Sequence, residues 1–167
     1  MKRFATALVA LATLAFTTPL LAAEPEYVTI KMEIEIAKPA ADVWAKVGGW
    51  CDISIWIPNF ECTVTSGDGG MGSVRSLLAG RILEIMIAQT ELSYGYTQPV
   101  TEGQFYILYH GFMEARPVTA TTSKMLYTLV YDVSNLADQA AKDADLARRR
   151  TTFEGALQRM KDIAEAP

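Results

Sequence analysis

The sequence of 167 residues predicts an α+β domain, in which one long helix covers the apolar face of an antiparallel sheet. Three observations predict this class: an alternating strand pattern at residues 27–36, six further strand patterns with short connections, and a final amphipathic helix pattern. Because short connections join antiparallel neighbours, we expect the six later strands to form a meander.

The first elements are a strand and two short helices. Residues 27–36, YVTIKMEIEI, alternate between apolar and mostly charged side chains, which is typical of a half-buried strand. The segment KPAADVWAKVGGW predicts a short helix that begins after Pro39 and ends at Gly48. CDISIWIPNF predicts a second short helix, which Pro58 ends.

The remaining elements are the meander and the long helix. Glycine and proline signals separate the strands, which we expect at residues 61–66, 73–78, 81–90, 92–98, 105–116 and 121–133. The helix runs from about residue 136 to 165. Its apolar residues recur at spacings of three and four and build one stripe from Phe153, Leu157, Met160, Ile163 and Ala164.

The first 23 residues have the composition of a secretory signal peptide. Two basic residues precede an apolar run from Phe4 to Phe16, and small residues end the segment at Ala23. The run is shorter than the roughly 20 residues that span a bilayer, so we expect no membrane anchor. We therefore expect a signal peptide at residues 1–23, a single domain at residues 24–167, and a periplasmic location.

Charge and composition exclude several classes of function. Without Lys2 and Arg3 the chain has 13 basic and 19 acidic residues, a net charge of −6, so we expect no nucleic-acid partner. One histidine and two cysteines without close spacing make a weak ligand set, so we expect no metal site. Spacing alone leaves open whether Cys51 and Cys62 form a disulfide.

The order of elements resembles the helix-grip superfamily, which includes START lipid-transfer domains, polyketide cyclases and dehydratases, and plant abscisic-acid receptors. The resemblance covers residues 26–165. PAADVWAKV is similar to the family's first helix, GSVRSL to its third strand, LEIMIAQTELSYGY to its fourth and fifth strands, and YHGFMEARP to its sixth. It implies a curved seven-stranded sheet around the C-terminal helix, with an internal cavity that commonly holds an apolar ligand.

The strongest candidate site comes from SVRSLLAGRILEI. A two-residue hairpin loop at Ala79 and Gly80 would place Arg75 directly opposite Glu84, and the resemblance turns this face toward the cavity. Arg75 could bind a carbonyl, carboxylate or phenolate oxygen. Glu84 could act as an acid or base, because burial raises and Arg75 lowers its pKa. A structural ion pair is the alternative.

The strand at residues 105–116 carries Tyr109 and His110 on opposite faces. The charged residues Glu114 and Arg116 share the face of His110, so we expect His110 to point outward and Tyr109 inward. A register shift of one residue would reverse this assignment. In the family the tyrosine that matches Tyr109 faces the cavity, which makes Tyr109 the third catalytic candidate beside Arg75 and Glu84.

Aromatic residues recur on the strand faces that we expect to point inward. A buried tyrosine combines a large apolar body with a hydroxyl that needs a partner, which suits an aromatic or oxygenated ligand. Ordinary core packing is the alternative. The ligand-binding candidates are Trp56, Tyr94, Tyr96, Met113, Tyr127, Tyr131, Arg149 and Phe153.

Two classes of function fit these residues. The first is an exported enzyme without a cofactor, which performs lyase, dehydratase or cyclase chemistry on a small aromatic or polyketide-like molecule. The second is a periplasmic carrier or sensor of a lipid, sterol or terpenoid. Leu108 and Phe112 are apolar residues that we expect on the outer face beside His110. A second copy of the chain could cover this face, so a homodimer is a further prediction.

Overall fold

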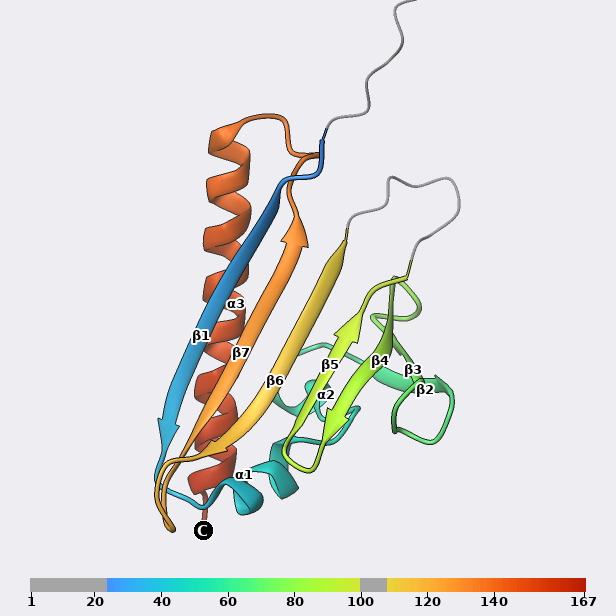
Figure 1. Ribbon diagram of the computed structural model, residues 1–167. Coiled ribbons are helices and arrows are strands. Elements are labelled where there is room, and N and C mark those ends of the chain that lie inside the picture. Colours follow the sequence, from blue (N-terminus) through green and yellow to red (C-terminus); the bar gives the residue numbers. More distant parts are fainter. Residues whose placement is uncertain (1–23, 100–107) are drawn as a thin grey trace, which may run out of the picture.

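A computed structural model describes residues 24–99 and 108–167 of the chain (Figure 1). The predicted signal peptide lies outside the described residues, as do residues 105–107 of the strand predicted at 105–116. The strands are β1 (Tyr27–Ile36), β2 (Cys62–Ser66), β3 (Val74–Leu77), β4 (Ile82–Thr90), β5 (Ser93–Thr97), β6 (Tyr109–Pro117) and β7 (Ser123–Asp132). The helices are α1 (Ala40–Val47), α2 (Ile53–Trp56) and α3 (Gln139–Glu165). Most elements begin or end a residue or two inside the predicted ranges.

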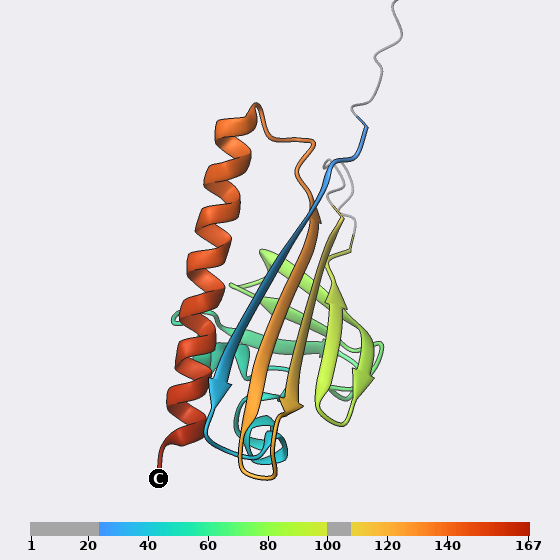
Figure 2. The same ribbon diagram turned by 60° about the vertical axis from the view of Figure 1, so that its left-hand side comes forward.

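The described strands form one antiparallel sheet in the order β1-β7-β6-β5-β4-β3-β2. From β2 to β7, strands that are adjacent in the sheet are also consecutive in sequence, which confirms the predicted meander. Strand β1 lies at the edge of the sheet, where it pairs with β7. The sheet curves, and α3 runs along β1 and β7 (Figure 1, Figure 2). The predicted α+β class with a helix-grip arrangement is therefore confirmed.

The helix α3 packs most closely through its second half. Asp138 caps its start, where the carboxylate accepts a hydrogen bond of 2.8 Å from the amide of Ala141. At the other end Lys161 donates to the carbonyl of Glu35 at 2.8 Å. Its fully buried residues all lie in the second half and are Ala156, Leu157, Met160 and Ala164. The first half, which carries Arg149, is only partly buried.

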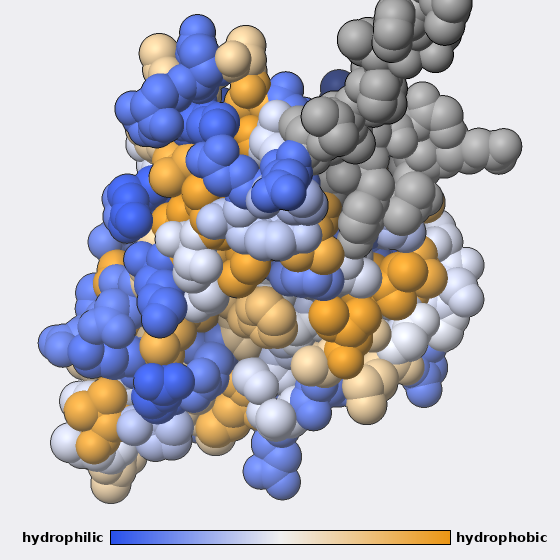
Figure 3. All heavy atoms as spheres, turned by 45° about the horizontal axis from the view of Figure 1, so that its top comes forward, coloured by the Kyte–Doolittle hydropathy of each residue, from blue (hydrophilic) through white to orange (hydrophobic). Residues whose placement is uncertain are grey.

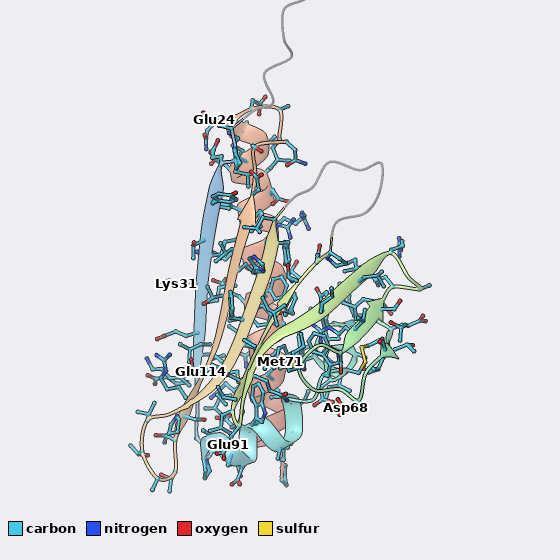
Figure 4. All side chains as sticks on the ribbon, turned by 45° about the vertical axis from the view of Figure 1, so that its right-hand side comes forward. Glu24, Lys31, Asp68, Met71, Glu91 and Glu114 are labelled. Carbon is cyan, nitrogen blue, oxygen red and sulfur yellow. A yellow bond between two sulfur atoms is a disulfide. The ribbon has the colours of Figure 1, made fainter. Side chains whose placement is uncertain are left out.

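The two faces of the sheet differ as the alternation predicts. On β7 the residues that face α3 are Met125, Tyr127, Leu129 and Tyr131, and each is 1% exposed or less. Lys31 and Glu114 lie on the side turned away from α3 (Figure 4). This outer face also exposes Leu83, Ile87 and Phe112, and hydrophobic residues gather over the β4 and β5 side of Figure 3. A homodimer through this face stays a prediction.

Cys51 and Cys62 form a disulfide, which answers the question that spacing left open. Their Cα atoms are 5.4 Å apart, and the bond ties the segment between α1 and α2 to the start of β2. The sulfur atoms are visible as a yellow bond beside the β2 and β3 strands in Figure 4. No helix within residues 24–99 and 108–167 is long and apolar enough to cross a membrane.

Gly111 on β6 lies beneath the ring of Tyr96, which crosses over it from β5. A Cβ atom at this position would overlap that ring, which has no room to move in the core. We expect Gly111→Ala to lower the free energy of unfolding by about 1–3 kcal/mol, as overpacked cores do. Urea denaturation followed by circular dichroism measures this loss.

Gly155 on α3 supplies the matched control. Nothing lies within 4 Å of the Cβ that alanine would add there, and the position is an exposed helix interior. Gly155→Ala is therefore expected to raise the free energy of unfolding by about 1 kcal/mol through helix propensity. Equal effects of the two changes would contradict the close packing of Tyr96 on Gly111.

Candidate functional site

Arg75 and Glu84 form a buried ion pair on the inner face of the sheet. Their Cα atoms are direct partners in the β3 and β4 register, as the sequence predicts. The Nε and Nη2 atoms of Arg75 lie 2.8 and 2.6 Å from Oε2 of Glu84. The other carboxylate oxygen, Oε1, accepts a hydrogen bond of 3.3 Å from the amide of Gln98. Arg75 has no exposed surface and Glu84 is 3% exposed.

The turn between β3 and β4 sets this register. Ala79 and Gly80 both have positive φ, 56° and 91°, which is the sign pattern of a type I′ hairpin turn. The amide of Arg81 donates to the carbonyl of Leu78 at 3.4 Å and closes the turn. Leu78 is also left-handed, with φ of 54°, and its amide bonds to the carbonyl of Glu61 on the segment before β2.

Aromatic rings surround the guanidinium of Arg75. Its central carbon lies 3.9 Å from the centroid of the Trp50 ring, 5.2 Å from that of Tyr96 and 5.8 Å from that of Tyr94. Its Nη1 atom also donates a hydrogen bond to the carbonyl of Trp50. Guanidinium groups are attracted to the faces of such rings. We call Trp50, Arg75, Glu84, Tyr94 and Tyr96 the Arg75 cluster.

Burial and charge oppose each other at Glu84. Burial raises the pKa of the Glu84 carboxyl, and the positive charge of Arg75 and its hydrogen bonds offset part of this rise. Burial lowers the pKa of Arg75, but the nearby Tyr94 and Glu84 side chains favour its charged form and together with further tyrosines outweigh burial, so its pKa is raised. On balance the pKa of the Glu84 carboxyl is raised above its ordinary value.

The inward tyrosines continue from the Arg75 cluster across the sheet. Ring centroids are 6.5 Å apart between Tyr94 and Tyr96, 6.3 Å between Tyr96 and Tyr109, and 5.8 Å between Tyr109 and Tyr131. We call these four residues the tyrosine row. The hydroxyl groups of Tyr96 and Tyr127 are hydrogen-bonded at 2.8 Å. Burial raises the pKa of Tyr109 to about 12, so this phenol is a neutral donor at physiological pH.

A second arginine lies at the far end of the tyrosine row. The guanidinium carbon of Arg149, on α3, is 4.3 Å from the ring centroid of Tyr131 and 5.0 Å from that of Tyr109. Its Nε atom donates to Oδ2 of Asp145 at 2.7 Å. Burial and the nearby Asp145 carboxylate raise the pKa of Tyr131. We call Tyr109, Tyr131, Asp145 and Arg149 the Arg149 cluster.

The structure brings most of the predicted site residues together. Arg75, Glu84 and Tyr109 share the inner face, together with the predicted Tyr94, Tyr96, Met113, Tyr127 and Tyr131. Phe153 on α3 lies over Tyr127, with centroids 4.5 Å apart. Trp56 is fully buried, and its indole N–H donates to the carbonyl of Val47 at 3.2 Å. That hydrogen bond gives Trp56 a structural role in joining α2 to α1.

His110 points to the outer face, as the sequence predicts. It is half-buried between buried Tyr109 and Gly111, and its ring centroid lies 6.4 Å from that of Phe112 on the same face. The β6 register is regular through Gly111, so no bulge reverses the assignment. The imidazole is therefore on the opposite side of the sheet from Arg75 and Glu84.

Three residues of the site were not among the predicted ones. Trp50 follows α1 and stacks on Arg75, Gln98 contacts Glu84, and Asp145 pairs with Arg149. Gln98 could have been found by extending the β4 and β5 register, where Ile85 pairs with Thr97, by one residue. Asp145 stands four residues before Arg149, the spacing of helix ion pairs. Nothing in the local sequence places Trp50 over Arg75.

Comparisons with known proteins support the fold alone. No protein-family model matches the sequence, and no curated protein matches it. Solved structures do match. The chain is similar to Zhui aromatase/cyclase from Streptomyces sp. R1128, with 16% identity, a TM-score of 0.66, and coverage of 84% of this chain and 94% of that one.

Two further solved structures match this chain over nearly their whole length. A protein from Thermobifida fusca is 22% identical, with a TM-score of 0.67 and coverage of 81% of this chain and 92% of that one. Ara h 8.0201 is 18% identical, with a TM-score of 0.60 and coverage of 83% and 98%. At such identities the likeness concerns the backbone, and it shows that the chain has the helix-grip fold of these structures.

Proposed function

We propose that the protein binds a small, mostly apolar molecule of aromatic or polyketide type against the Arg75 cluster and performs acid–base chemistry on it without a cofactor. The observation that carries the proposal is the fully buried Arg75–Glu84 pair among aromatic rings. Replacing a buried ion pair by apolar residues is often neutral or stabilising. A functional role for this pair would explain why the fold keeps it.

The proposed chemistry is a dehydration or retro-aldol cleavage of a β-hydroxy ketone. For dehydration, Glu84 takes the proton from the carbon beside the carbonyl, and the electron pair moves toward the carbonyl oxygen, where Arg75 stabilises the negative charge. The enolate then expels the β-hydroxyl group, which takes a proton from Tyr109 and leaves as water. Proton transfer from Glu84 to the Tyr109 phenolate restores both groups.

A periplasmic carrier or sensor of a lipid, sterol or terpenoid is the second candidate. The mutual hydrogen bond of Tyr96 and Tyr127 favours it, because these two hydroxyls satisfy each other and leave an apolar surface. The predicted export also suits the transport of poorly soluble molecules. Zhui is named as an aromatase/cyclase, whereas the name Ara h 8.0201 states no activity, and both structures are similar to this chain. The fold alone therefore does not distinguish an enzyme from a carrier.

The test incubates the purified protein with a panel of aromatic β-hydroxy ketones and follows loss of water or of a carbonyl fragment by mass spectrometry. Glu84→Gln and Tyr109→Phe are expected to lower turnover by about 100- to 10,000-fold, because each removes a proton-transfer group. Their affinities for the substrate should change little. Circular dichroism first establishes that each variant is folded.

Exposed residues of the same types provide the controls. Glu114→Gln on the outer face and Tyr27→Phe at the start of β1 should leave turnover unchanged. Binding without turnover in every protein, together with a lipid or terpenoid that co-purifies in native mass spectrometry, would identify a carrier. Turnover that survives both Glu84→Gln and Tyr109→Phe would contradict the assigned roles.

A further inference from the structure

The Arg149 cluster has unused capacity to bind a ligand. Arg149 uses its Nε atom in the ion pair with Asp145 at 2.7 Å, so its two terminal nitrogens take no part in that pair. Tyr131 is only 1% exposed, and its hydroxyl has no hydrogen-bond partner of good geometry among the described residues, although the Asp145 carboxylate is nearby. Buried hydroxyl groups are nearly always paired, so this one is suited to an incoming group.

The charges around Arg149 do not balance. Asp145 is the only carboxylate that pairs with Arg149 among the described residues, and the same carboxylate also pairs with Arg148. Counted together with Arg148, whose side chain is 63% exposed, the cluster has two positive charges for one carboxylate. The Arg75 cluster differs, because Glu84 matches the charge of Arg75 one to one. An anion therefore gains more from the Arg149 end, and a neutral carbonyl group suits the Arg75 end.

The tyrosine row connects these two ends. The guanidinium carbon of Arg75 is 5.2 Å from the Tyr96 centroid, the Tyr96 and Tyr109 centroids are 6.3 Å apart, and the guanidinium carbon of Arg149 is 5.0 Å from the Tyr109 centroid. Arg75, Tyr96 and Tyr109 lie on the inner face of the sheet, and Arg149 approaches the same face from α3. One fused aromatic ring system could therefore lie along the row with a polar group at each end.

We propose that the Arg149 cluster is an anion subsite, which binds a carboxylate at the end of an aromatic ligand whose other end carries a neutral carbonyl at Arg75. The Arg149 guanidinium and the Tyr131 hydroxyl donate to the carboxylate oxygens. This inference rests on the proposed function, and it adds the class of ligand: an aromatic keto acid rather than an uncharged polyketide, sterol or terpenoid.

The test compares two probes that differ by one group, acetylnaphthalene and an acetylnaphthoic acid with its carboxylate on the far ring. Intrinsic tryptophan fluorescence or calorimetry gives both dissociation constants. We expect the acid to bind at least tenfold more tightly to the unaltered protein. Arg149→Gln should abolish this preference, so that the two probes bind the variant with about equal affinity. Tyr131→Phe, which removes only the hydroxyl, should reduce the preference several-fold.

Arg150→Gln is the matched control, because Arg150 is the next residue on α3 but is exposed and pairs with Glu154 instead. It should keep the full preference for the acid. Equal binding of both probes to the unaltered protein, or a preference that survives Arg149→Gln, would overturn the anion subsite and leave the proposed function standing. If neither probe binds, the proposed function fails and the subsite fails with it.

Discussion

Replacing Arg75 by methionine is expected to lower the free energy of unfolding by about 3–5 kcal/mol, because it leaves the Glu84 carboxylate buried without its partner. Methionine fills a similar volume, so the loss reports mainly the missing charge and hydrogen bonds. Arg75 also stacks on Trp50 and bonds to its carbonyl, and both contacts are lost in the variant. Urea denaturation at neutral pH measures the effect.

The pH dependence of this loss identifies its cause. Burial already raises the pKa of Glu84, and removing Arg75 raises it further. In the unfolded chain a glutamate carboxyl has a pKa of about 4.3. When folding raises this pKa, the carboxyl stabilises the folded state fully at pH values below the unfolded pKa. That stabilisation is lost as the pH rises through the folded pKa. The deficit of Arg75→Met should therefore be smallest near pH 4 and grow toward neutral pH.

Two further variants control this prediction. Arg116 pairs with Glu114 in an exposed ion pair on the outer face, which solvent screens, so Arg116→Met should change the free energy of unfolding little. The double variant Arg75→Met, Glu84→Leu removes both buried charges and should recover most of the lost stability. A deficit that stays constant from pH 4 to neutral pH, or that the double variant fails to repair, would contradict a charge-based cause.

Loss of the disulfide is expected to cost roughly 3 kcal/mol, the usual effect of opening a short loop. Cys51 and Cys62 are 11 residues apart in sequence, and Cys51 directly follows Trp50. Cys62 belongs to β2, whose Val64 pairs with Arg75 on β3. The bond therefore holds Trp50 close to Arg75, and we expect its loss to weaken binding of acetylnaphthalene as well as to reduce stability.

The measurement compares unfolding and binding with and without a reducing agent. The double variant Cys51→Ala, Cys62→Ala should match the reduced protein in both properties and should not respond to the reducing agent. Trp50→Phe keeps the disulfide and the backbone carbonyl but changes the ring, so it separates the stacking contribution from the tether. Unchanged binding after reduction would show that Trp50 stays in place without the covalent bond.

Local sequence patterns were sufficient to predict the elements and the central pair. Alternation along each strand fixes which side chains face α3, and the turn at Ala79 and Gly80 fixes Arg75 opposite Glu84. Both features are set by residues close together in sequence. The same reasoning assigned Tyr109 to the inner face and His110 to the outer face, and the regular β6 register confirms it.

Contacts between distant segments could not be predicted in this way. Trp50 reaches Arg75 only because the loop after α1 folds back over β3, and strand alternation carries no information on that approach. Arg149 could be assigned to the apolar side of a helix, but its two tyrosine neighbours depend on how α3 lies across β6 and β7. The catalytic and binding roles of all these residues stay predictions, because each depends on a ligand.

The pairing of β1 with β7 constrains the order in which the chain can fold. Tyr27 pairs with Asp132 and Ile36 with Ser123, so β1, the first described strand, pairs with β7, the last one. Strands β2 to β7 pair with sequence neighbours and close short loops, whereas β1 must close a loop that contains the entire meander. A growing chain therefore has no edge for β1 to join until β7 has been synthesised, and the N-terminal strand stays unpaired until then.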